Sequence, residues 1–429
     1  MERHPGRPRR VVIIGGGFGG LTAAHALRRA AVEIVLIDRT NHHLFQPLLY
    51  QVATAALSPN DIASPLRTIL RGQDNVTVLM AEAREIDRAL RVVRLADGRD
   101  IPFDALIVAP GTRHSYFGHP EWETFAPGLK TVADALRIRE RILMSFEQAA
   151  VLDDPREAEP WLTFVVVGGG PTGVELAGAM AEIAFRGLLP DFPMLRREQL
   201  RIILLEGSGR ILGGFSERLA ARGLAMLAQL GVDVRLHAAV TGVTEKGVTV
   251  GDRVIETRNV IWAPGNVAPA LLRTLHAPLG PHGHVHVRPD LTIEGEPFVF
   301  VIGDAAVCDD ETGQPLPALA PVAMQQARYV ARLIADARPP ETRAPFRYVD
   351  RGTMATIGKA RAIAQIGPIR TAGVFAWLLW SVVHIFFLIG FRNRVRVMLE
   401  WMWYYVTFRP GARIIYSRAS GGGQRRSGS

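Results

Sequence analysis

The chain has 429 residues, of which 48% are hydrophobic and 21% charged, and its formal net charge is +9. This length exceeds what one hydrophobic core usually supports, so we expect two or three domains. The composition excludes wholesale disorder, and a polytopic membrane protein is excluded because only one segment is apolar enough to consider as a span. The single cysteine, Cys308, excludes a disulfide scaffold, a Cys-x-x-Cys redox centre and a cysteine-ligated metal site.

A glycine-rich turn follows the first apolar run of the chain. Val11–Ile14 is too short for the apolar region of an export signal, and it leads directly into the G-x-G-x-x-G pattern of Gly15, Gly17 and Gly20. An Ala-rich segment, 21–29, and a second apolar run, 32–37, come next. We interpret the whole as a strand–loop–helix–strand unit that binds a dinucleotide phosphate at the helix N-terminus.

The same pattern occurs a second time. The apolar run 164–167 precedes Gly168, Gly170 and Gly173, a helix is predicted over Val174–Arg186, and the run 202–205 ends the unit. Each unit closes with an acid, Asp38 in the first and Glu206 in the second. A carboxylate at that point accepts hydrogen bonds from ribose hydroxyls and repels a 2′-phosphate, so Glu206 favours NADH over NADPH. Arg210, four residues later, softens that preference in principle.

Two intact glycine turns predict two nucleotide ligands. The usual combination is a bound flavin and a visiting nicotinamide, with the flavin carrying the chemistry. We find no G-x-S-x-G, H-E-x-x-H or Walker-type loop that would indicate another reaction. The run of His282, His284 and His286 is interpreted as a surface strand, because no further metal ligands are evident nearby, so no metal is predicted.

On these residues the chain resembles the type II NADH dehydrogenases, which are single-subunit, non-proton-pumping NADH:quinone oxidoreductases. The resemblance runs from residue 10 to about residue 416. The glycine motifs are shared with the wider flavoprotein superfamily, whereas Phe45–Thr54 and the aromatic, basic C-terminal segment are specific to the family.

The resemblance implies a set of cofactor-binding residues. FAD would be held by Gly15, Gly17, Gly20, Asp38, Ala83, Ala109, Pro110, Gly111, Gly303 and Asp304. NADH would be held by Gly168, Gly170, Gly173 and Glu206, and Ala263 and Gly265 are further cofactor-binding residues. Glu175 matches a family carboxylate near the nicotinamide and flavin. The alternative for Glu175 is an acid that is favoured in the first helical turn by the helix dipole alone.

The resemblance also implies a quinone site in a segment that the family writes A-Q-x-A-x-Q. Gln325 matches the second glutamine and is followed by Gln326, but Pro321 replaces the first glutamine. Lys359 is a further candidate for this site, and a solvated surface lysine is the alternative. We therefore predict Glu175 and Gln325 as catalytic residues.

Related activities can be weighed against the same residues. Disulfide reductases and sulfide:quinone oxidoreductases of this fold need cysteines near the flavin, and Cys308 alone cannot serve. A soluble ferredoxin- or rubredoxin-type reductase stays as the alternative enzyme. A nucleotide-sensing protein whose basic tail meets nucleic acid is a third, non-enzymatic class.

The positive charge of the chain is concentrated at its C-terminal end. Residues 392–429 hold eight arginines and one acid, Glu400, so they carry +7 and leave only +2 for the rest. The preceding segment, Thr371–Phe391, has 21 uncharged residues, and Asn393–Phe408 is amphipathic and rich in Trp and Tyr. Its apolar residues form a stripe at i, i+3, i+4, i+7 spacing, made of Val395, Met398, Leu399, Met402, Tyr405 and Val406. We interpret the two segments as helices lying in an anionic membrane interface rather than as one span. A dimer interface or a core helix pair is the alternative.

The fold class predicted is α/β, with two Rossmann-like domains of the glutathione-reductase type and a C-terminal membrane-associating helical segment. The expected divisions are 1–120 and 276–340 for FAD, 121–275 for NADH and 341–429 for membrane docking. The predicted protein is peripheral, on the cytoplasmic face of the inner or plasma membrane. Its predicted partners are a membrane quinone and an anionic lipid surface, with a homodimer through the C-terminal region, and no nucleic acid is expected.

Overall fold

The computed structural model describes residues 8–407 and 411–415, which group into two compact units. Of the described residues, unit 1 comprises 8–45, 63–115 and 265–352, and unit 2 comprises 46–62, 116–264, 353–407 and 411–415. The sequence-based division differs from these units, because it includes 46–62 in the FAD domain and makes 341–429 a separate region. That four-part division stays a prediction. The predicted α/β class is confirmed.

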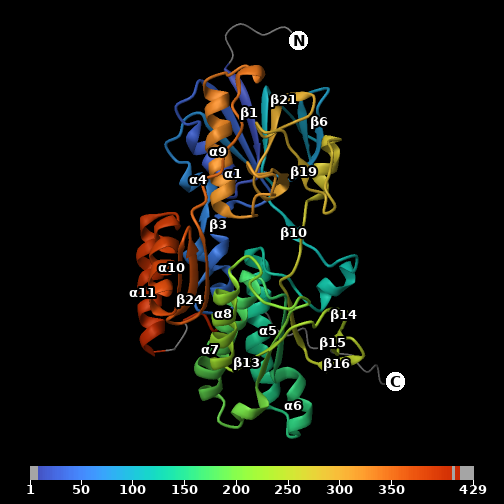
Figure 1. Cartoon of the computed structure of the whole chain (residues 1–429), viewed down its shortest axis with the longest axis vertical. Coiled ribbons are helices and arrows are strands. Elements are labelled where there is room, and N and C mark those ends of the chain that lie inside the picture. Colours follow the sequence, from blue (N-terminus) through green and yellow to red (C-terminus); the bar gives the residue numbers. More distant parts are fainter. Residues whose placement is uncertain (1–7, 408–410, 416–429) are drawn as a thin grey trace, which may run out of the picture. The chain divides into compact units, whose positions relative to one another are not determined.

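Unit 1 is built on a six-stranded sheet with the strand order β20-β21-β9-β1-β2-β5. Its strands are β1 (Arg9–Ile14), β2 (Val32–Asp38), β5 (Val76–Met80), β9 (Ala105–Val108), β20 (Thr292–Ile293) and β21 (Glu296–Val301). All neighbouring pairs are parallel except β20 with β21. The central strands are buried on both faces, which explains why they read as continuous apolar runs. Helices α1 (Phe18–Ala26) and α9 (Ala320–Ala335) pack together beside this sheet (Figure 1).

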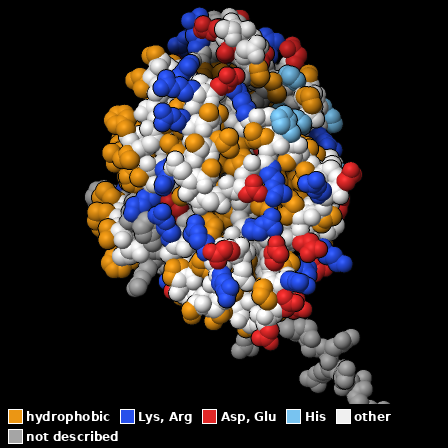
Figure 2. Space-filling model, turned by 60° about the horizontal axis from the view of Figure 1, so that its bottom comes forward, with side chains coloured by type: hydrophobic (Ala, Val, Ile, Leu, Met, Phe, Trp, Pro, Cys, Tyr) orange, Lys and Arg blue, Asp and Glu red, His pale blue; other side chains and the backbone are white. Residues whose placement is uncertain are grey.

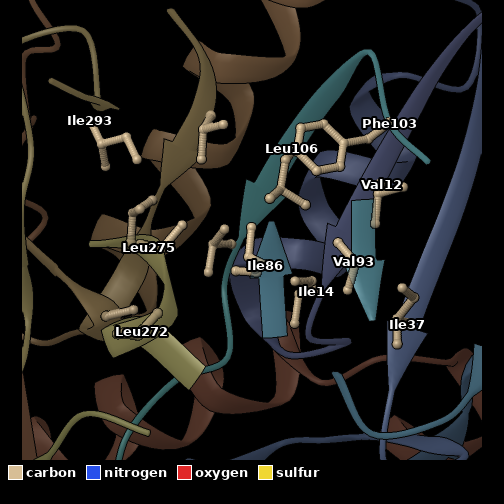
Figure 3. Close-up of a cluster of buried hydrophobic side chains, with 14 of the residues drawn as sticks. Val12, Ile14, Ile37, Ile86, Val93, Phe103, Leu106, Leu272, Leu275 and Ile293 are labelled. Carbon is tan, nitrogen blue, oxygen red and sulfur yellow. The ribbon is translucent and has the colours of Figure 1, made fainter. Parts of the chain in front are cut away.

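A second layer covers the sheet of unit 1. It is the antiparallel sheet of β6 (Ala83–Asp87), β7 (Val92–Leu95) and β8 (Asp100–Pro102). Figure 3 shows Ile86 and Val93 from this layer directed at Val12, Ile14 and Leu106 from the six-stranded sheet. Burial of these side chains fixes the sheet on which the first glycine turn sits.

Unit 1 also contains short strands and helices outside its two main sheets. They are β3 (His42–Leu44), β4 (Ala63–Pro65), α4 (Leu66–Ile69), β10 (Arg113–His114), β18 (Asn266–Val267), β19 (Val285–His286), η7 (Gly303–Ala305) and β22 (Ala306–Val307). Strand β19 pairs in parallel with β22.

Unit 2 repeats the nucleotide-binding arrangement with a parallel sheet ordered β13-β12-β11-β17. Its strands are β11 (Thr163–Val167), β12 (Arg201–Leu205), β13 (Val232–Arg235) and β17 (Asn259–Trp262). The helices of this part are α5 (Val132–Ala150), α6 (Pro155–Leu162), α7 (Pro171–Glu182) and α8 (Glu217–Gln229). A second sheet holds β14 (Val240–Thr244), β15 (Gly247–Val250) and β16 (Arg253–Glu256). The helix predicted through Arg186 is α-helical only to Glu182, and Ile183–Leu188 continues it as a π-helix.

The C-terminal part of unit 2 is a three-stranded antiparallel sheet followed by two helices. The strands are β23 (Thr353–Gly358), β24 (Arg361–Ile366) and β25 (Ile369–Ala372), and the helices are α10 (Val374–Phe387) and α11 (Phe391–Thr407). Strand β23 packs against α7, and α10 packs against all three strands. Two short helices from residues 46–62, α2 (Leu49–Ala53) and α3 (Pro59–Ile62), complete the unit.

The uncharged segment Thr371–Phe391 is divided by two glycines. Gly373 and Gly390 both have positive φ, at 90° and 88°, and they bound a helix of 14 residues. A helix of that length spans about 21 Å, which is less than the hydrocarbon thickness of a bilayer. Within the part of the chain that the structure describes, no helix combines the length and apolarity needed to cross a membrane.

Candidate functional site

The first glycine turn lies at the carboxyl end of the parallel strands of unit 1. Gly15 follows β1 with φ at 101°, and a Cβ there would overlap the carbonyl oxygen of Ala109, which follows β9. A Cβ at Gly20 would overlap the carbonyl oxygen of Gly15, so helix and strand meet more closely than a side chain allows. Gly17, in contrast, is exposed and has no neighbouring atom within 4 Å of an added Cβ. The second glycine therefore leaves its backbone open to an approaching phosphate.

The second glycine turn, which lies in unit 2, has the same geometry as the first. Gly168 follows β11 with φ at 99°, and a Cβ at Gly173 would overlap the carbonyl oxygen of Gly168. Gly170 is exposed and has open space around it, as Gly17 has in the first turn. Because α7 begins at Pro171, the first free backbone amides of that helix face the turn. Both turns thus fit a dinucleotide pyrophosphate.

The two strand-end acids are held in matching ways. Gly16 N donates to Asp38 Oδ2 at 2.6 Å, and Gly169 N donates to Glu206 Oε2 at 2.6 Å. The other oxygen of each carboxylate accepts from a backbone amide two residues later, at 2.7 Å in both cases. Thr40 Oγ1 also donates to Asp38 Oδ1 at 2.7 Å, so a lone-pair site for a ribose hydroxyl is left on Asp38 Oδ2 and on both oxygens of Glu206. Each acid therefore bonds to its glycine turn, which faces the phosphates, and lies at the position expected to bind the ribose.

Two further side chains bear on these loops. His43, which the sequence analysis did not single out, donates from Nδ1 to the carbonyl oxygen of Gly16 at 3.0 Å. Its burial lowers the imidazole pKa, which favours the neutral ring. The two peptide groups that flank Gly16 are therefore each held by a side chain, one by Asp38 and one by His43. In unit 2, Arg210 Nη2 donates to the carbonyl oxygen of Gly213 at 2.7 Å, so the guanidinium is engaged within its own loop.

The remaining predicted flavin residues of unit 1 gather at the same sheet edge. Ala109, Pro110 and Gly111 follow β9, and Gly303 and Asp304 follow β21 by way of Ile302. An added Cβ at Gly19 would lie 3.2 Å from Ile302 Cδ1 and 3.6 Å from Ala109 Cβ, so the ends of β9 and β21 meet α1 there. Ala83 is the first residue of β6. Two residues earlier in the chain, Ala81 N donates to the carbonyl oxygen of Asp38.

Glu175 lies in α7, against the strand β23. Thr356 N donates to its Oε1 at 3.3 Å, and a Cβ at Gly178 would overlap the carbonyl oxygen of Ile357, so helix and strand are in close contact. The residue keeps some exposed surface, but its carboxyl group lies deep among protein atoms. This desolvation raises the pKa of Glu175 to about 8. Glu182, two turns later at the end of α7, is buried and accepts from Lys359 N at 2.7 Å, and burial raises its pKa.

The predicted quinone residues have protein partners. Gln325 forms two hydrogen bonds with the backbone of Val349, at 2.9 and 3.0 Å. Gln326 is buried, and its Oε1 accepts from Gly303 N at 2.7 Å. Lys359 belongs to unit 2 and the two glutamines to unit 1, so their meeting at one site stays a prediction.

Two candidates for other chemistry can be placed as well. Cys308 is buried, which raises its thiol pKa to about 11 and keeps the sulfur protonated. Of the three histidines at 282–286, His284 donates from Nδ1 to the carbonyl oxygen of Asp304 at 2.7 Å, whereas His282 and His286 are exposed. Among the described residues there is no group of three His, Cys, Asp or Glu side chains placed to hold a metal.

The helices α10 and α11 expose an unusual amount of apolar surface. The large exposed side chains are Val374, Phe375, Leu378, Val382 and Phe386 on α10, and Met398, Leu399, Met402, Trp403 and Val406 on α11. Hydrophobic side chains gather at the left edge of Figure 2, the side on which Figure 1 shows these helices. The predicted stripe therefore faces outward on α11. The Tyr405 side chain and the arginines at 409, 418, 425 and 426 lie outside the described residues.

The inner side of the same helices is anchored within unit 2. Trp401 stacks on Trp380 with ring centroids 5.5 Å apart, and its Nε1 donates to Gln51 Oε1 at 2.7 Å. Arg396 Nε lies 3.4 Å from Oδ1 of the buried Asp61. The family-specific segment around Gln51 thus holds the helix pair in place.

Paired glycine turns with strand-end acids, on two α/β sheets, define the class of pyridine nucleotide-disulphide oxidoreductases, and the profile of that family matches residues 9–327. A second profile, the NDH2 C-terminal domain, matches residues 351–409. The chain belongs to the type II NADH:quinone oxidoreductases within this class.

Curated relatives and solved structures agree with this assignment. The type II NADH:quinone oxidoreductase Ndh of Mycobacterium tuberculosis is 45% identical over 96% of this chain and 91% of its own length. Demethylphylloquinone reductase NdbB of Synechocystis is 30% identical over 92% of this chain and 96% of its own length. A structure of NDH2 from Plasmodium falciparum has a TM-score of 0.86 at 18% identity, covering 96% of this chain and all of that one, which shows the fold.

Proposed function

We propose that this chain is an NADH:quinone oxidoreductase that contains FAD and does not pump protons. Bound FAD would accept a hydride from NADH and pass two electrons to a membrane quinone. The observation that carries the proposal is the pair of equivalent glycine turns with their carboxylates, in a chain 45% identical to a named enzyme of this type. The flavoprotein class and the NADH-dependent relatives support both cofactors.

The residues of the chain have distinct roles in this proposal. Gly15, Gly17 and Gly20 cradle the FAD pyrophosphate, and Asp38 binds the adjoining ribose. Gly168, Gly170, Gly173 and Glu206 do the same for NADH, and Ala83, Ala109, Pro110, Gly111, Ala263, Gly265, Gly303 and Asp304 line the cofactor sites. The Glu206 carboxylate disfavours a 2′-phosphate, and since Arg210 bonds within its own loop, we propose NADH as the substrate.

Glu175 would hold or release a proton near the nicotinamide. A pKa of about 8 leaves its carboxyl group mostly protonated at neutral pH, so a proton is available when charge changes nearby. Gln325 and Lys359 are proposed to contribute to the quinone site. These assignments depend on the match to the family motif and on the positions described above.

We further propose that α10 and α11 dock on an anionic lipid surface without spanning it. The support is the outward apolar stripe of the two helices, together with the exposed Arg392 in the first turn of α11. A homodimer through these helices would cover the same stripe. We also propose that this attachment is peripheral and lies on the cytoplasmic face of the inner or plasma membrane.

The activity is tested with the purified flavin-loaded chain, NADH and a short-chain quinone. We expect NADH oxidation coupled to quinol formation. Absence of flavin, or oxidation only with a ferredoxin- or rubredoxin-type carrier, would reject the proposal in favour of the soluble reductase.

Docking is tested by flotation with vesicles that contain anionic lipid. The double variant Phe375→Glu and Met402→Glu charges the stripe on both helices, and Val151→Glu charges an apolar residue that is 75% exposed elsewhere in unit 2. We expect the double variant alone to lose vesicle binding. Unchanged binding would reject docking through this stripe, and a monomeric double variant that still floats would assign the stripe to the dimer.

A further inference from the structure

The turn at Gly303 and Asp304 is held by two polar side chains from other parts of unit 1. Gly303 has φ at 67°, and its N–H donates to Gln326 Oε1 of α9 at 2.7 Å. Asp304 O accepts from His284 Nδ1 at 2.7 Å. One contact lies at each end of the two-residue turn, so its peptide planes are fixed from both sides.

The elements around the turn explain how these side chains reach it. An added Cβ at Gly303 would lie 3.1 Å from Ala323 Cβ, so α9 approaches the turn closely and brings Gln326 to it. Strand β19 pairs in parallel with β22, with Val285 opposite Ala306. This register places His284, which precedes β19, beside the residues that precede β22.

The chemistry of the two side chains is well defined. A carbonyl oxygen only accepts, so His284 carries its proton on Nδ1. Gln326 is 1% exposed, and removal of its oxygen would leave the half-buried Gly303 N–H beside an apolar group. An amide shielded from water without a partner is destabilising, so the turn would adopt another conformation.

We propose that Gln326 and His284 are flavin-positioning residues, which together set the Gly303–Asp304 turn for binding of FAD. The inference rests on the proposed binding of FAD by unit 1. It gives Gln326 a role different from the predicted contact with quinone, and it gives His284 a role unrelated to metal. Neither residue is proposed to touch a reacting atom.

The test measures binding of FAD to the flavin-stripped full chain, without NADH or quinone. Gln326→Leu and His284→Phe remove the two contacts, and Gln326→Glu and His284→Asn keep an acceptor and a donor in similar positions. Gln314→Leu and His286→Phe are matched controls, because both residues lie in unit 1 and both are exposed. The flavin absorbance spectrum and midpoint potential are recorded for each loaded variant.

We expect the first two variants to weaken FAD binding about tenfold or more, as loss of a partly buried hydrogen bond that orders the turn implies. The conservative variants and the controls should bind within about threefold of the unaltered chain, because they keep the contacts. The Gln326→Leu, His284→Phe double variant should lose less than the product of the single effects, since both contacts hold one turn. The spectrum and potential should shift in the single variants and not in the controls.

Equal FAD affinity and spectra across all variants would overturn the inference, and so would controls that weaken binding as much as the test variants. Where either large substitution prevents folding, judged by thermal unfolding, Gln326→Ser and His284→Ala remove the same contacts and are interpreted in the same way. A chain that binds FAD with this pattern but does not reduce quinone would reject the proposed function and leave this inference standing.

Discussion

Replacement of Glu175 by glutamine tests whether this carboxyl group is neutral in the folded protein. Its pKa is about 8 in place of the ordinary 4.5, because the surroundings desolvate the charged form. Between these two values the folded chain keeps a proton that the unfolded chain releases. Stability is therefore lost as the pH rises from 4.5 to about 8, and it changes little above that range.

The size of the effect follows from the shift. The difference between pKa 4.5 and about 8 corresponds to about 5 kcal/mol, and we take roughly half of it, about 2–3 kcal/mol, because Glu175 is partly exposed. Glu175→Gln has no carboxyl group to ionise. The variant should therefore gain about 2–3 kcal/mol over the unaltered chain between pH 5 and pH 9.

The assay is urea unfolding of the flavin-loaded protein, followed at pH 5, 7 and 9. Glu147→Gln, at an exposed position of α5, is the control and should follow the unaltered chain at every pH. A constant difference between Glu175→Gln and the unaltered chain, within about 0.5 kcal/mol, would refute the reasoning, because it would mean that Glu175 ionises normally. NADH oxidation by the unaltered chain should also decline above pH 8, and that decline should be absent in the variant.

Three other substitutions test single contacts. Gly170→Ala should keep the thermal midpoint but raise the KM for NADH at least tenfold, because only a bound pyrophosphate would meet the new Cβ. An unchanged KM would contradict the NADH site. Gly178→Ala should cost about 1–3 kcal/mol in thermal unfolding, because its Cβ overlaps the carbonyl oxygen of Ile357, and equal stability would contradict the close packing of α7 on β23. Trp401→Phe should cost about 1–2 kcal/mol by urea unfolding, since it removes the donor to Gln51, and no loss would mean that this hydrogen bond does not anchor α11.

The nucleotide turns could be predicted from sequence because their determinants are local. The glycines, the preceding apolar strand and the closing acid lie within about 40 residues of each other, and strand and helix periods are visible there. The placement of Asp38 and Glu206 at the ends of β2 and β12 follows directly from that pattern.

The partners of several site residues could not be predicted, because they depend on long-range packing. Glu175 meets Thr356, which is 181 positions later, and Gln326 meets Gly303 through the approach of α9. No periodicity in the sequence indicates these pairs. The same applies to residues 46–62, which continue a strand of unit 1 in sequence but pack in unit 2, where Gln51 bonds to Trp401.

The sequence predicted two C-terminal helices, but it did not predict the residues at which the first of them begins and ends. The apolar run was visible as one segment of 21 residues, and only the backbone shows that Gly373 and Gly390 adopt positive φ and shorten it to the 14 residues of α10. The side of α11 that faces inward is set by the stacking of Trp401 on Trp380, which sequence patterning alone does not reveal.

The central claim is that electrons pass from NADH through the flavin of this chain to a quinone. The most direct measurement is the absorbance spectrum of the purified protein without oxygen, first alone, then with NADH, then with a short-chain quinone. We expect an oxidised flavin spectrum that NADH bleaches and quinone restores. A spectrum without flavin, a flavin that NADH does not bleach, or a bleached flavin that quinone leaves unchanged would contradict it.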